Sequence, residues 1–415
     1  MPITAEEKSI LRALAREYRE YAENPVNEER ERRARLTNGL THVRPIVGIH
    51  ELPWNELNID NQLTLRCTDP FARSMEDFFR KRILQWKYFQ GDMILEKYFR
   101  IQKAYDNSGW GMNKKDSIVA IDETNHIVSH QYEDQLDTEE KLDQLRLPVI
   151  TARPDVDTER VALAEEVLDG IMPVRLTGTY IYANMWDKIA THRGVQPLYL
   201  DLALRPEFMH ETMRRFTAIF AATIDQMDAQ GLFSSNVLDL HCTPGYSDEL
   251  DAIEKKNGCG TRASGWYRGL AQPFSSVSPE MHEEFEIEYI RPIAETFGFT
   301  YYGCCEPLHD RLDGLKKIKN LRKVGCTPWA DVQSTAEQLG KDYVLSRKPN
   351  PAMVVGTLDE DAIRKEVRET AEACIKYGCP WDYTLKDIST ASYKISNLTR
   401  WNEVVQETLD EYYGR

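Results

Sequence analysis

The stretch Tyr301-Tyr302-Gly303-Cys304-Cys305-Glu306 is a short apolar run that ends on thiol and carboxyl side chains. It is one of seven runs that end on a polar or metal-capable residue, the others being Ile46–His50, Pro173–Thr177, Val237–Cys242, Lys323–Cys326, Tyr343–Ser346 and Tyr383–Asp387. Segments with helical periodicity lie between most of them. Repeated strand-then-helix units of this kind predict a buried parallel sheet. We therefore expect an α/β fold, most economically a (β/α)8 TIM barrel.

The regions outside these runs predict an extension and an insertion. Residues 1–40 read as an N-terminal helical extension, with Thr4 and Glu7 at the spacing of a capping box, and residues 41–415 read as the barrel. The acidic region 108–153 is expected to contain a hairpin and to cover part of the barrel mouth. The second strand is poorly marked, and either residues 145–150 or residues 118–121 must supply it.

Four further helices are predicted from apolar periodicity and capping residues. They cover residues 75–99, 279–296, 359–377 and 397–412, with Ser74 and Ser278 as N-terminal caps and Gly378 as a C-terminal cap.

The composition excludes several classes of protein. A net charge of −15 and a pI near 5.2 argue against a nucleic-acid binder, because phosphate neutralisation needs a basic surface. No apolar run approaches the roughly 18–20 residues that span a bilayer, so we expect no membrane partner and a cytoplasmic protein. The eight scattered cysteines are expected to be reduced thiols rather than a disulfide framework. A homodimer is compatible with this surface, although no feature selects it.

Thiols and an imidazole are predicted to meet at the barrel mouth, because function collects at the C-terminal ends of barrel strands. Cys305 and Cys326 end consecutive strands and are a plausible pair of zinc ligands. A third ligand is expected among His241, Cys242, Glu306 and His309, and His241 or Glu306 could also act in acid–base catalysis. The alternative is that the cysteines are small buried residues that pack beneath the site.

Basic and aromatic residues complete the predicted site. Arg347 and Lys348 end a strand before two prolines, an arrangement suited to orienting a polar or anionic group, with Arg347 binding substrate and Lys348 taking part in catalysis. Structural turn chemistry explains this loop equally well. Trp186, Tyr180 and Trp110 are candidates to line an apolar substrate pocket, although large aromatic residues are usually core.

Four segments carry a resemblance to a known superfamily. They are Gln272-Pro273 with Val277–Met281, Tyr302–Glu306, Cys326–Asp331 and Ser346–Pro351. At these positions the chain resembles the uroporphyrinogen decarboxylase-like superfamily, whose barrel also houses cobalamin-linked, zinc-dependent methyltransferases. The arginine-rich motif of the decarboxylases is missing, since the corresponding start reads Arg44–His50. Where the coenzyme M branch has His-x-Cys, Gly303 replaces the histidine, while the anaerobic O-demethylase methyltransferases use varied ligand sets.

The resemblance implies a zinc-dependent methyltransferase. A methyl group would move from a small methylated substrate, for example an aromatic methyl ether, to cobalamin on a separate corrinoid protein, because no corrinoid-binding motif occurs in this chain. One alternative is a metal-free decarboxylase or lyase in which Arg347, Lys348 and a carboxylate handle an anionic substrate. Another is an accessory protein that docks a corrinoid carrier without chemistry.

Overall fold

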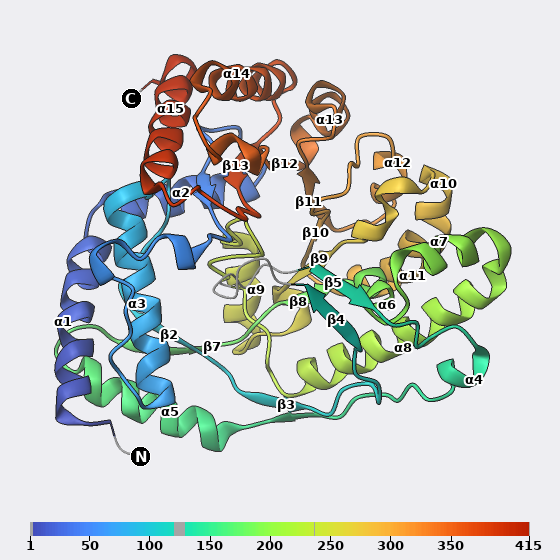
Figure 1. Cartoon of the computed structure of the whole chain (residues 1–415), viewed down its shortest axis with the longest axis horizontal. Helices are drawn as coiled ribbons and strands as arrows, with labels where there is room; N and C mark the ends of the chain where they lie inside the picture. The colour runs from blue at the N-terminus through green and yellow to red at the C-terminus, as the bar shows by residue number, and fades with distance from the viewer. Residues whose placement is uncertain (1–2, 120–128, 236, 415) are drawn as a thin grey trace.

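A curved parallel sheet organises the protein. The computed structural model describes residues 3–119, 129–235 and 237–414. Its main sheet has seven parallel strands, which are, in spatial order, β1 (Val47–Ile49), β13 (Trp381–Leu385), β12 (Val344–Arg347), β11 (Leu321–Cys326), β10 (Phe299–Tyr302), β9 (Trp266–Gly269) and β8 (Ile181–Ala183). Helices surround this sheet (Figure 1). The α/β class and the parallel sheet are thus confirmed.

Helices cover the outer face of the sheet, and their apolar sides form one large core with the strands. They are α6 (Met185–Arg193), α7 (Val195–Leu204), α8 (Pro206–Ala229), α10 (Pro279–His282), α11 (Glu288–Ala294), α12 (Leu312–Leu315), α13 (Val332–Leu339), α14 (Glu360–Tyr377) and α15 (Ile395–Tyr413). Two of the predicted caps are confirmed in these helices. Ser278 accepts the Met281 N–H at the start of α10, and Gly378 ends α14 in the left-handed conformation.

Five of the seven predicted runs supply strands of the main sheet, and two do not. The run at residues 173–177 forms β7 (Val174–Thr177), which pairs in parallel with β2 (Phe99–Gln102) in a separate sheet beside α5 (Pro154–Leu168). Strands β8 and β9 were not predicted. The pairing of the described residues leaves β1 and β8 as the edges of the main sheet, so it shows a barrel-like arc rather than a closed eight-stranded barrel.

The predicted strand at 237–242 is wrong, because this segment is a tight loop. The Leu240 N–H donates to the Thr243 carbonyl at 2.8 Å, and the Gly245 N–H donates to the Val237 carbonyl at 3.1 Å. The chain therefore turns back on itself. Gly245 permits the close approach, since an added Cβ would lie 2.8 Å from both the Val237 carbonyl oxygen and a Leu240 side-chain carbon.

Neither predicted source of a second barrel strand supplies one. Residues 116–119 form β4 (Asp116–Val119), which pairs antiparallel with β5 (Ser129–Tyr132); residues 120 and 121 of that prediction lie outside the described part of the chain. The other predicted segment, residues 145–150, leads into β6 (Ile150–Ala152), which pairs antiparallel with β3 (Tyr105–Asn107). The expected hairpin within 108–153 is confirmed as β4–β5, and α4 (Glu139–Leu142) follows it.

The N-terminal region is helical as predicted. Helix α1 (Ala5–Ala22) starts at the Thr4–Glu7 capping box, and α2 (Val26–Asn38) follows. Helix α3 (Pro70–Phe89) begins earlier than expected and is capped by Asp69 rather than Ser74. The described helices include none that is both long and apolar enough to cross a bilayer.

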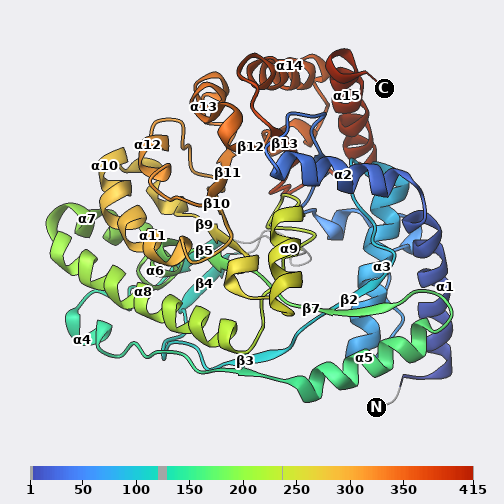
Figure 2. The ribbon, with the colours of Figure 1, turned by 180° about the vertical axis from the view of Figure 1, so that it is seen from behind.

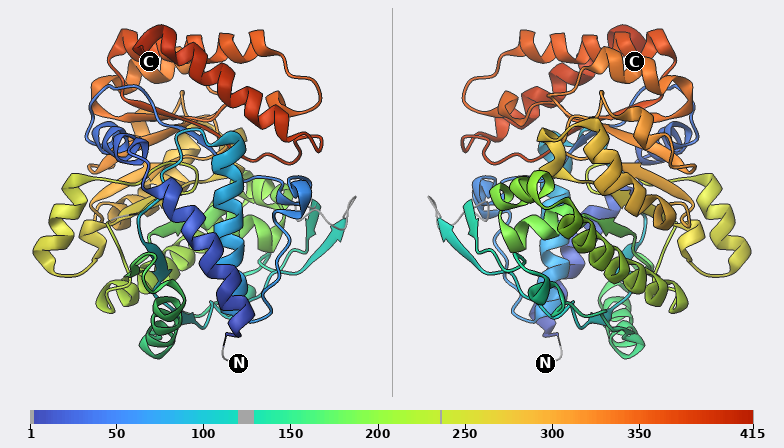
Figure 3. Two further views of the ribbon diagram at one scale, coloured as in Figure 1. Left: turned by 90° about the vertical axis from the view of Figure 1, so that its left-hand side faces the viewer. Right: turned by 90° about the vertical axis from the view of Figure 1, so that its right-hand side faces the viewer.

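The two ends of the sheet carry different elements. Helix α9 (Asp248–Asn257) lies beside α2 on the side seen in Figure 2, and Arg35 of α2 contacts Asp251 of α9 at 2.7 Å. Because α2 leads into β1 and α9 into β9, this is the end where strands begin. The β4–β5 hairpin projects at the opposite end (Figure 3). It therefore lies on the side where the parallel strands end.

Candidate metal and thiol site at the strand ends

His241 and Cys242 occupy the tip of the 237–245 loop. Their φ angles are 54° and 69°, positive values that are required at both central positions of a type I′ turn and are usually met by Asn and Gly. The Asp239 carboxylate supports the turn by accepting the Cys242 N–H at 2.7 Å. Non-glycine residues held in this region of backbone space cluster at functional sites, which makes this loop tip a candidate.

Buried charged side chains support the 237–245 loop. Lys348 donates to the Cys242 carbonyl at 2.6 Å, and Thr243 donates to the Asp382 carboxylate at 2.8 Å. Lys323 completes the group with bonds of 2.8 Å to Thr243 and 2.9 Å to Asp382. The structure therefore places Lys348, predicted to be catalytic, as a support of the loop that carries His241 and Cys242.

Glu51 joins His241 and Cys242 to make a group of metal-capable donors. One donor atom from each residue lies within 4.8 Å of the other two. Glu51 follows β1 and its Oε1 is 3.4 Å from Nδ1 of His241. Burial, followed by a hydrogen bond with Asp387, raises the pKa of Glu51. An imidazole, a thiol and a carboxylate thus converge where β1 ends.

Two thiols lie on the other side of the His241 ring. Cys304 Sγ is 3.7 Å from His241 Nε2 and 3.6 Å from Cys305 Sγ. Lys386, which follows β13, donates to Cys304 at 3.2 Å. The hydrogen bond from Cys305, the contact with His241 and the charges of Arg268 and Lys386 hold the pKa of Cys304 well below the usual thiol value against the effect of burial. The contact with Cys304, followed by burial, instead raises the pKa of Cys305, so Cys304 is the more acidic thiol of the pair.

Gly303 explains why no histidine stands immediately before this thiol pair. Its φ is +100°, and a Cβ at this position would lie 2.3 Å from a methyl carbon of Leu308. A histidine would be strained in this backbone conformation. The imidazole near Cys304 comes instead from His241, on a loop distant in sequence.

Cys326 does not join the other thiols. Its side chain packs in the core between sheet and helices and accepts a hydrogen bond from Arg347 at 3.5 Å. Arg347 in turn pairs with Glu366 of α14 at 2.7 Å. Both side chains therefore point outward toward the helices, whereas Lys323, three residues before Cys326, points into the sheet's interior. The structure does not bring Cys305 and Cys326 together as a ligand pair.

Glu306 and Asp187 form an acidic group near the thiols. Glu306 accepts the backbone N–H groups of Ala271 at 3.1 Å and Cys304 at 3.0 Å, and it is 1% exposed. Through these hydrogen bonds Glu306 links the loop after β9 to the loop after β10. Burial, followed by the Glu306 charge, raises the pKa of Asp187 to about 7. Asp187 is therefore a carboxyl group that can hold a proton near neutral pH.

The three predicted aromatic pocket residues lie in different surroundings. Trp186 is fully buried and donates to the Phe285 carbonyl at 3.1 Å. Trp110 packs against Phe216 under the Lys188 ammonium. Tyr180 lines a surface cavity with Asp239. The Tyr182 ring does lie at the candidate site, because its centroid is 5.0 Å from that of His241.

Several site residues were missed although the sequence held a signal for them. Lys386 and Asp387 end a recognised run, and Glu51 follows another by one residue. The rule that function collects at strand ends applies to all three as well as to the cysteines. Arg268 gave no such signal, because β9 was not recognised as a strand.

Comparisons with known proteins leave the family open. No protein-family model and no curated protein matches the chain. Among solved structures, a methyltransferase from Methanosarcina mazei is similar over 92% of this chain and 99% of that one, at 12% identity and a TM-score of 0.48. A likeness of this degree identifies no reaction, and the function has to be inferred from the side chains.

The donor set of Glu51, His241 and Cys242 fits zinc. Zinc takes nitrogen, sulfur and carboxylate ligands, and three protein ligands with one open position are typical of catalytic sites. Tetrahedral bonds of about 2.0–2.3 Å separate neighbouring ligand atoms by roughly 3.3–3.8 Å. With donors up to 4.8 Å apart, the side chains need to close by roughly 1 Å on binding. The contact of His241 Nε2 with Cys304 would supply the hydrogen-bond partner that metal-binding imidazoles almost always have on their second nitrogen.

Proposed function

We propose that this protein is a zinc-dependent methyltransferase. The metal is held by Glu51, His241 and Cys242, and the methyl group moves from a small methylated substrate to the cobalt of a separate corrinoid protein. The observation that carries the proposal is the convergence of these three donors beside the Cys304–Cys305 pair at the end of parallel strands. The choice of methyl transfer rests on the superfamily resemblance of the strand-end segments.

The chain's own residues have distinct roles in this proposal. When bound, zinc supplies Lewis acidity toward the oxygen of an aromatic methyl ether. Cys304 accepts a hydrogen bond from His241 Nε2 and so orients the imidazole, while Lys386 balances the thiolate charge. Asp187, neutral below about pH 7, is available to protonate the leaving oxygen. The Lys348 bond keeps Cys242 in place.

The scaffold and partners belong to the same proposal. We infer a (β/α)8 barrel over residues 41–415, preceded by the helical extension 1–40. The insertion 108–153 covers part of the mouth, where its hairpin projects. The open mouth accommodates the corrinoid partner. The basic pair invoked for a metal-free lyase is already engaged, because Arg347 pairs with Glu366 and Lys348 with Cys242.

A methyl-transfer assay tests the proposal. Zinc-loaded protein is mixed with an aromatic methyl ether and reduced cobalamin, and methylcobalamin is followed by its absorbance. We expect product only with zinc and none in Cys242→Ser, since a ligand is lost. Cys259→Ser is the matched control, because Cys259 is exposed on the surface. Equal rates in both variants would contradict the assignment of Cys242.

A further inference from the structure

Cys304 and Cys305 are adjacent in the chain, and their sulfur atoms lie side by side. The two Sγ atoms are 3.6 Å apart, and both cysteines are free. Cys304 is 1% exposed, whereas Cys305 is partly exposed. A disulfide has a sulfur–sulfur distance of about 2.05 Å, so the two atoms have to approach by roughly 1.5 Å. The structure therefore holds a reduced thiol pair whose sulfurs are close enough to join after a small side-chain rotation.

A lysine ammonium contacts both thiols. Lys386 Nζ lies 3.2 Å from Cys304 Sγ and 3.5 Å from Cys305 Sγ. The reactive form of a thiol is the thiolate, which a neighbouring cation stabilises. The partial exposure of Cys305 gives a small oxidant access to the pair. Redox-sensitive cysteines share these features, which are a stabilised thiolate, access from solvent and a second cysteine beside the first.

A second pair of neighbouring thiols provides an internal comparison. Cys374, near the end of α14, is hydrogen-bonded to Cys379, which precedes β13. Both side chains are 0% exposed and belong to the main core. An oxidant in solvent reaches such a pair only when the core opens. We expect Cys374 and Cys379 to stay reduced under conditions that oxidise the pair at the strand ends.

We propose that Cys304 and Cys305 form a reversible disulfide when the protein meets a hydroperoxide. With hydrogen peroxide, one sulfur attacks a peroxide oxygen, the O–O bond breaks, and the other oxygen leaves as water with the proton of that thiol. The second sulfur then attacks the oxidised one, so that the S–S bond forms and the S–O bond breaks. A second water leaves with the remaining thiol proton. The two thiols lose two electrons, which reduce the peroxide.

The covalent geometry of adjacent residues makes this disulfide easy to reduce. Consecutive Cα atoms are about 3.8 Å apart, below the roughly 4.4–6.8 Å that most disulfides span. A disulfide formed under such strain has a higher reduction potential, and strained disulfides are the labile ones. A dithiol reductant therefore restores both thiols by exchange and is itself oxidised to a disulfide.

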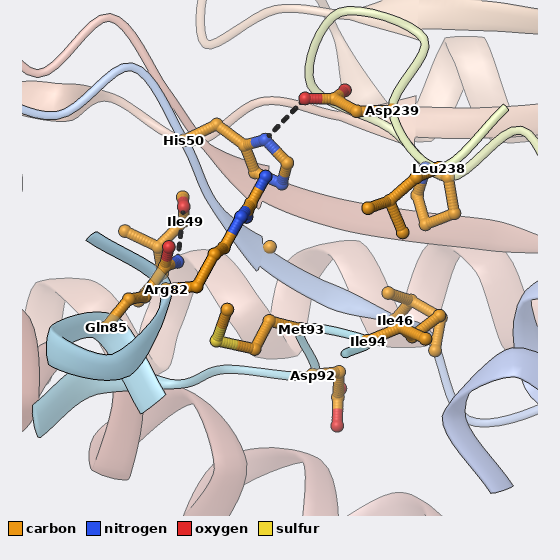
Figure 4. A pocket seen from close by; sticks show the side chains of 12 residues that line it. Ile46, Ile49, His50, Arg82, Gln85, Asp92, Met93, Ile94, Leu238 and Asp239 are labelled. Atoms are coloured by element: carbon orange, nitrogen blue, oxygen red, sulfur yellow. Dashed lines mark hydrogen bonds and ion pairs between the residues drawn. The ribbon is translucent and has the colours of Figure 1, made fainter. Parts of the chain in front are cut away.

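Oxidation also breaks the contact between Cys304 and His241. The loop that carries this histidine is held independently of the thiols, since Asp239 accepts the Cys242 N–H at 2.7 Å and is bonded to His50 at 3.1 Å (Figure 4). The imidazole therefore keeps its place when the sulfur turns away, and Nε2 loses its partner at 3.7 Å. Zinc affinity then falls roughly 10- to 100-fold, the usual effect of losing such a partner; this step alone rests on the proposed function.

Mass spectrometry after peroxide treatment tests the disulfide without reference to any metal. The protein is the metal-free, full-length Cys259→Ser variant, which lacks an exposed thiol that could join two chains. It is treated with hydrogen peroxide, unfolded, labelled with N-ethylmaleimide and digested with trypsin. The tryptic peptide 269–311 contains Cys304 and Cys305 and no other cysteine. We expect this peptide to carry no label and to be lighter by two hydrogen atoms, and to take up two labels after dithiothreitol.

Two further variants complete this test. Cys304→Ser and Cys305→Ser each remove one half of the bond, so the remaining cysteine should carry a label or added oxygen. The peptides of Cys374 and Cys379 should stay labelled. Two labels on peptide 269–311 after peroxide, added oxygen in place of the disulfide, or equally fast oxidation of Cys374 and Cys379 would overturn the inference.

Zinc titration of the reduced and the oxidised protein tests the effect on His241. We expect the roughly 10- to 100-fold weaker binding after oxidation to be reversed by dithiothreitol. Equal zinc affinity in the two forms would overturn this step. A disulfide in a protein that binds no zinc in either form would keep the thiol chemistry and reject the proposed function, whereas zinc binding without a disulfide would do the reverse.

Discussion

Replacing Asp382 by Asn is expected to destabilise the protein strongly, because this carboxylate joins the buried charges beneath the 237–245 loop. It accepts hydrogen bonds from Lys323 at 2.9 Å, Thr243 at 2.8 Å and Ser346 at 2.6 Å. Lys348 lies 3.8 Å away. Asn has nearly the same shape but no charge, so the variant leaves two buried ammonium groups without their counter-ion.

The size of the effect follows from this burial. The side chains of Lys323 and Asp382 are 1% and 2% exposed. Removing one partner of a buried ion pair typically costs about 3–5 kcal/mol, a large share of the roughly 5–15 kcal/mol that stabilises most proteins. Although burial alone would raise the pKa of Asp382, Lys323 and Lys348 lower it below its usual value. A lowered carboxyl pKa contributes stability at neutral pH that is lost as pH falls through that pKa.

Urea unfolding followed by circular dichroism measures the loss. We expect Asp382→Asn to lower the free energy of unfolding by about 3–5 kcal/mol at neutral pH, with a smaller difference from the wild type in acid. The double variant Asp382→Asn/Lys323→Met should lose less than the sum of the single changes, because an uncompensated charge is removed. A loss below about 1 kcal/mol, within the range of a surface ion pair, would refute this reasoning.

Two further predictions concern residues around the site. Trp186→Ala should lower the free energy of unfolding by about 3–5 kcal/mol without changing zinc content, because a fully buried ring is lost from the core; loss of zinc in a folded variant would contradict the structural role. Asp187 should give an infrared band of a protonated carboxyl group that disappears as pH rises through about 7, and the band should be absent in Asp187→Asn. Since its folded pKa is raised, Asp187 should also make the protein less stable as pH rises through that range; a wild-type band that is absent at pH 6 would contradict the assignment.

Much of the sheet could be predicted because short apolar runs end on polar residues. Strands β8 and β9 were not predicted from such runs. Strand β8 has three residues, and β9 contains Arg268, whose charge does not suggest a buried strand. The fold accommodates that guanidinium over the Tyr301 ring, 4.0 Å from its centroid. Such compensation by a cation–π contact depends on tertiary packing and is absent from local sequence pattern.

The 237–242 segment shows a second limit. Its alternation of apolar and polar residues favours a strand, and His241-Cys242 lacks the Asn-Gly signal of a type I′ turn. The turn is held instead by the Asp239 side chain and the distant Lys348. Only the folded arrangement supplies the second of these contacts.

The sequence indicated the chemical type and the location of the candidate site better than it indicated the individual ligands. His241 and the thiols at the strand ends were recognised as a group. The prediction that Cys326 is a zinc ligand did not take into account that side chains alternate between the two faces along a strand. Lys323 and Cys326 are three residues apart in β11 and so face opposite sides, and Lys323 takes the inner one.

Zinc content of the purified protein and three variants tests the central claim most directly. We expect about one zinc per chain in the wild type and in Cys326→Ala. Cys242→Ser and His241→Gln should lose the metal, because each removes one of three proposed ligands. Zinc retained in Cys242→Ser but lost in Cys326→Ala, or no zinc in the wild type after reconstitution, would contradict the proposed site.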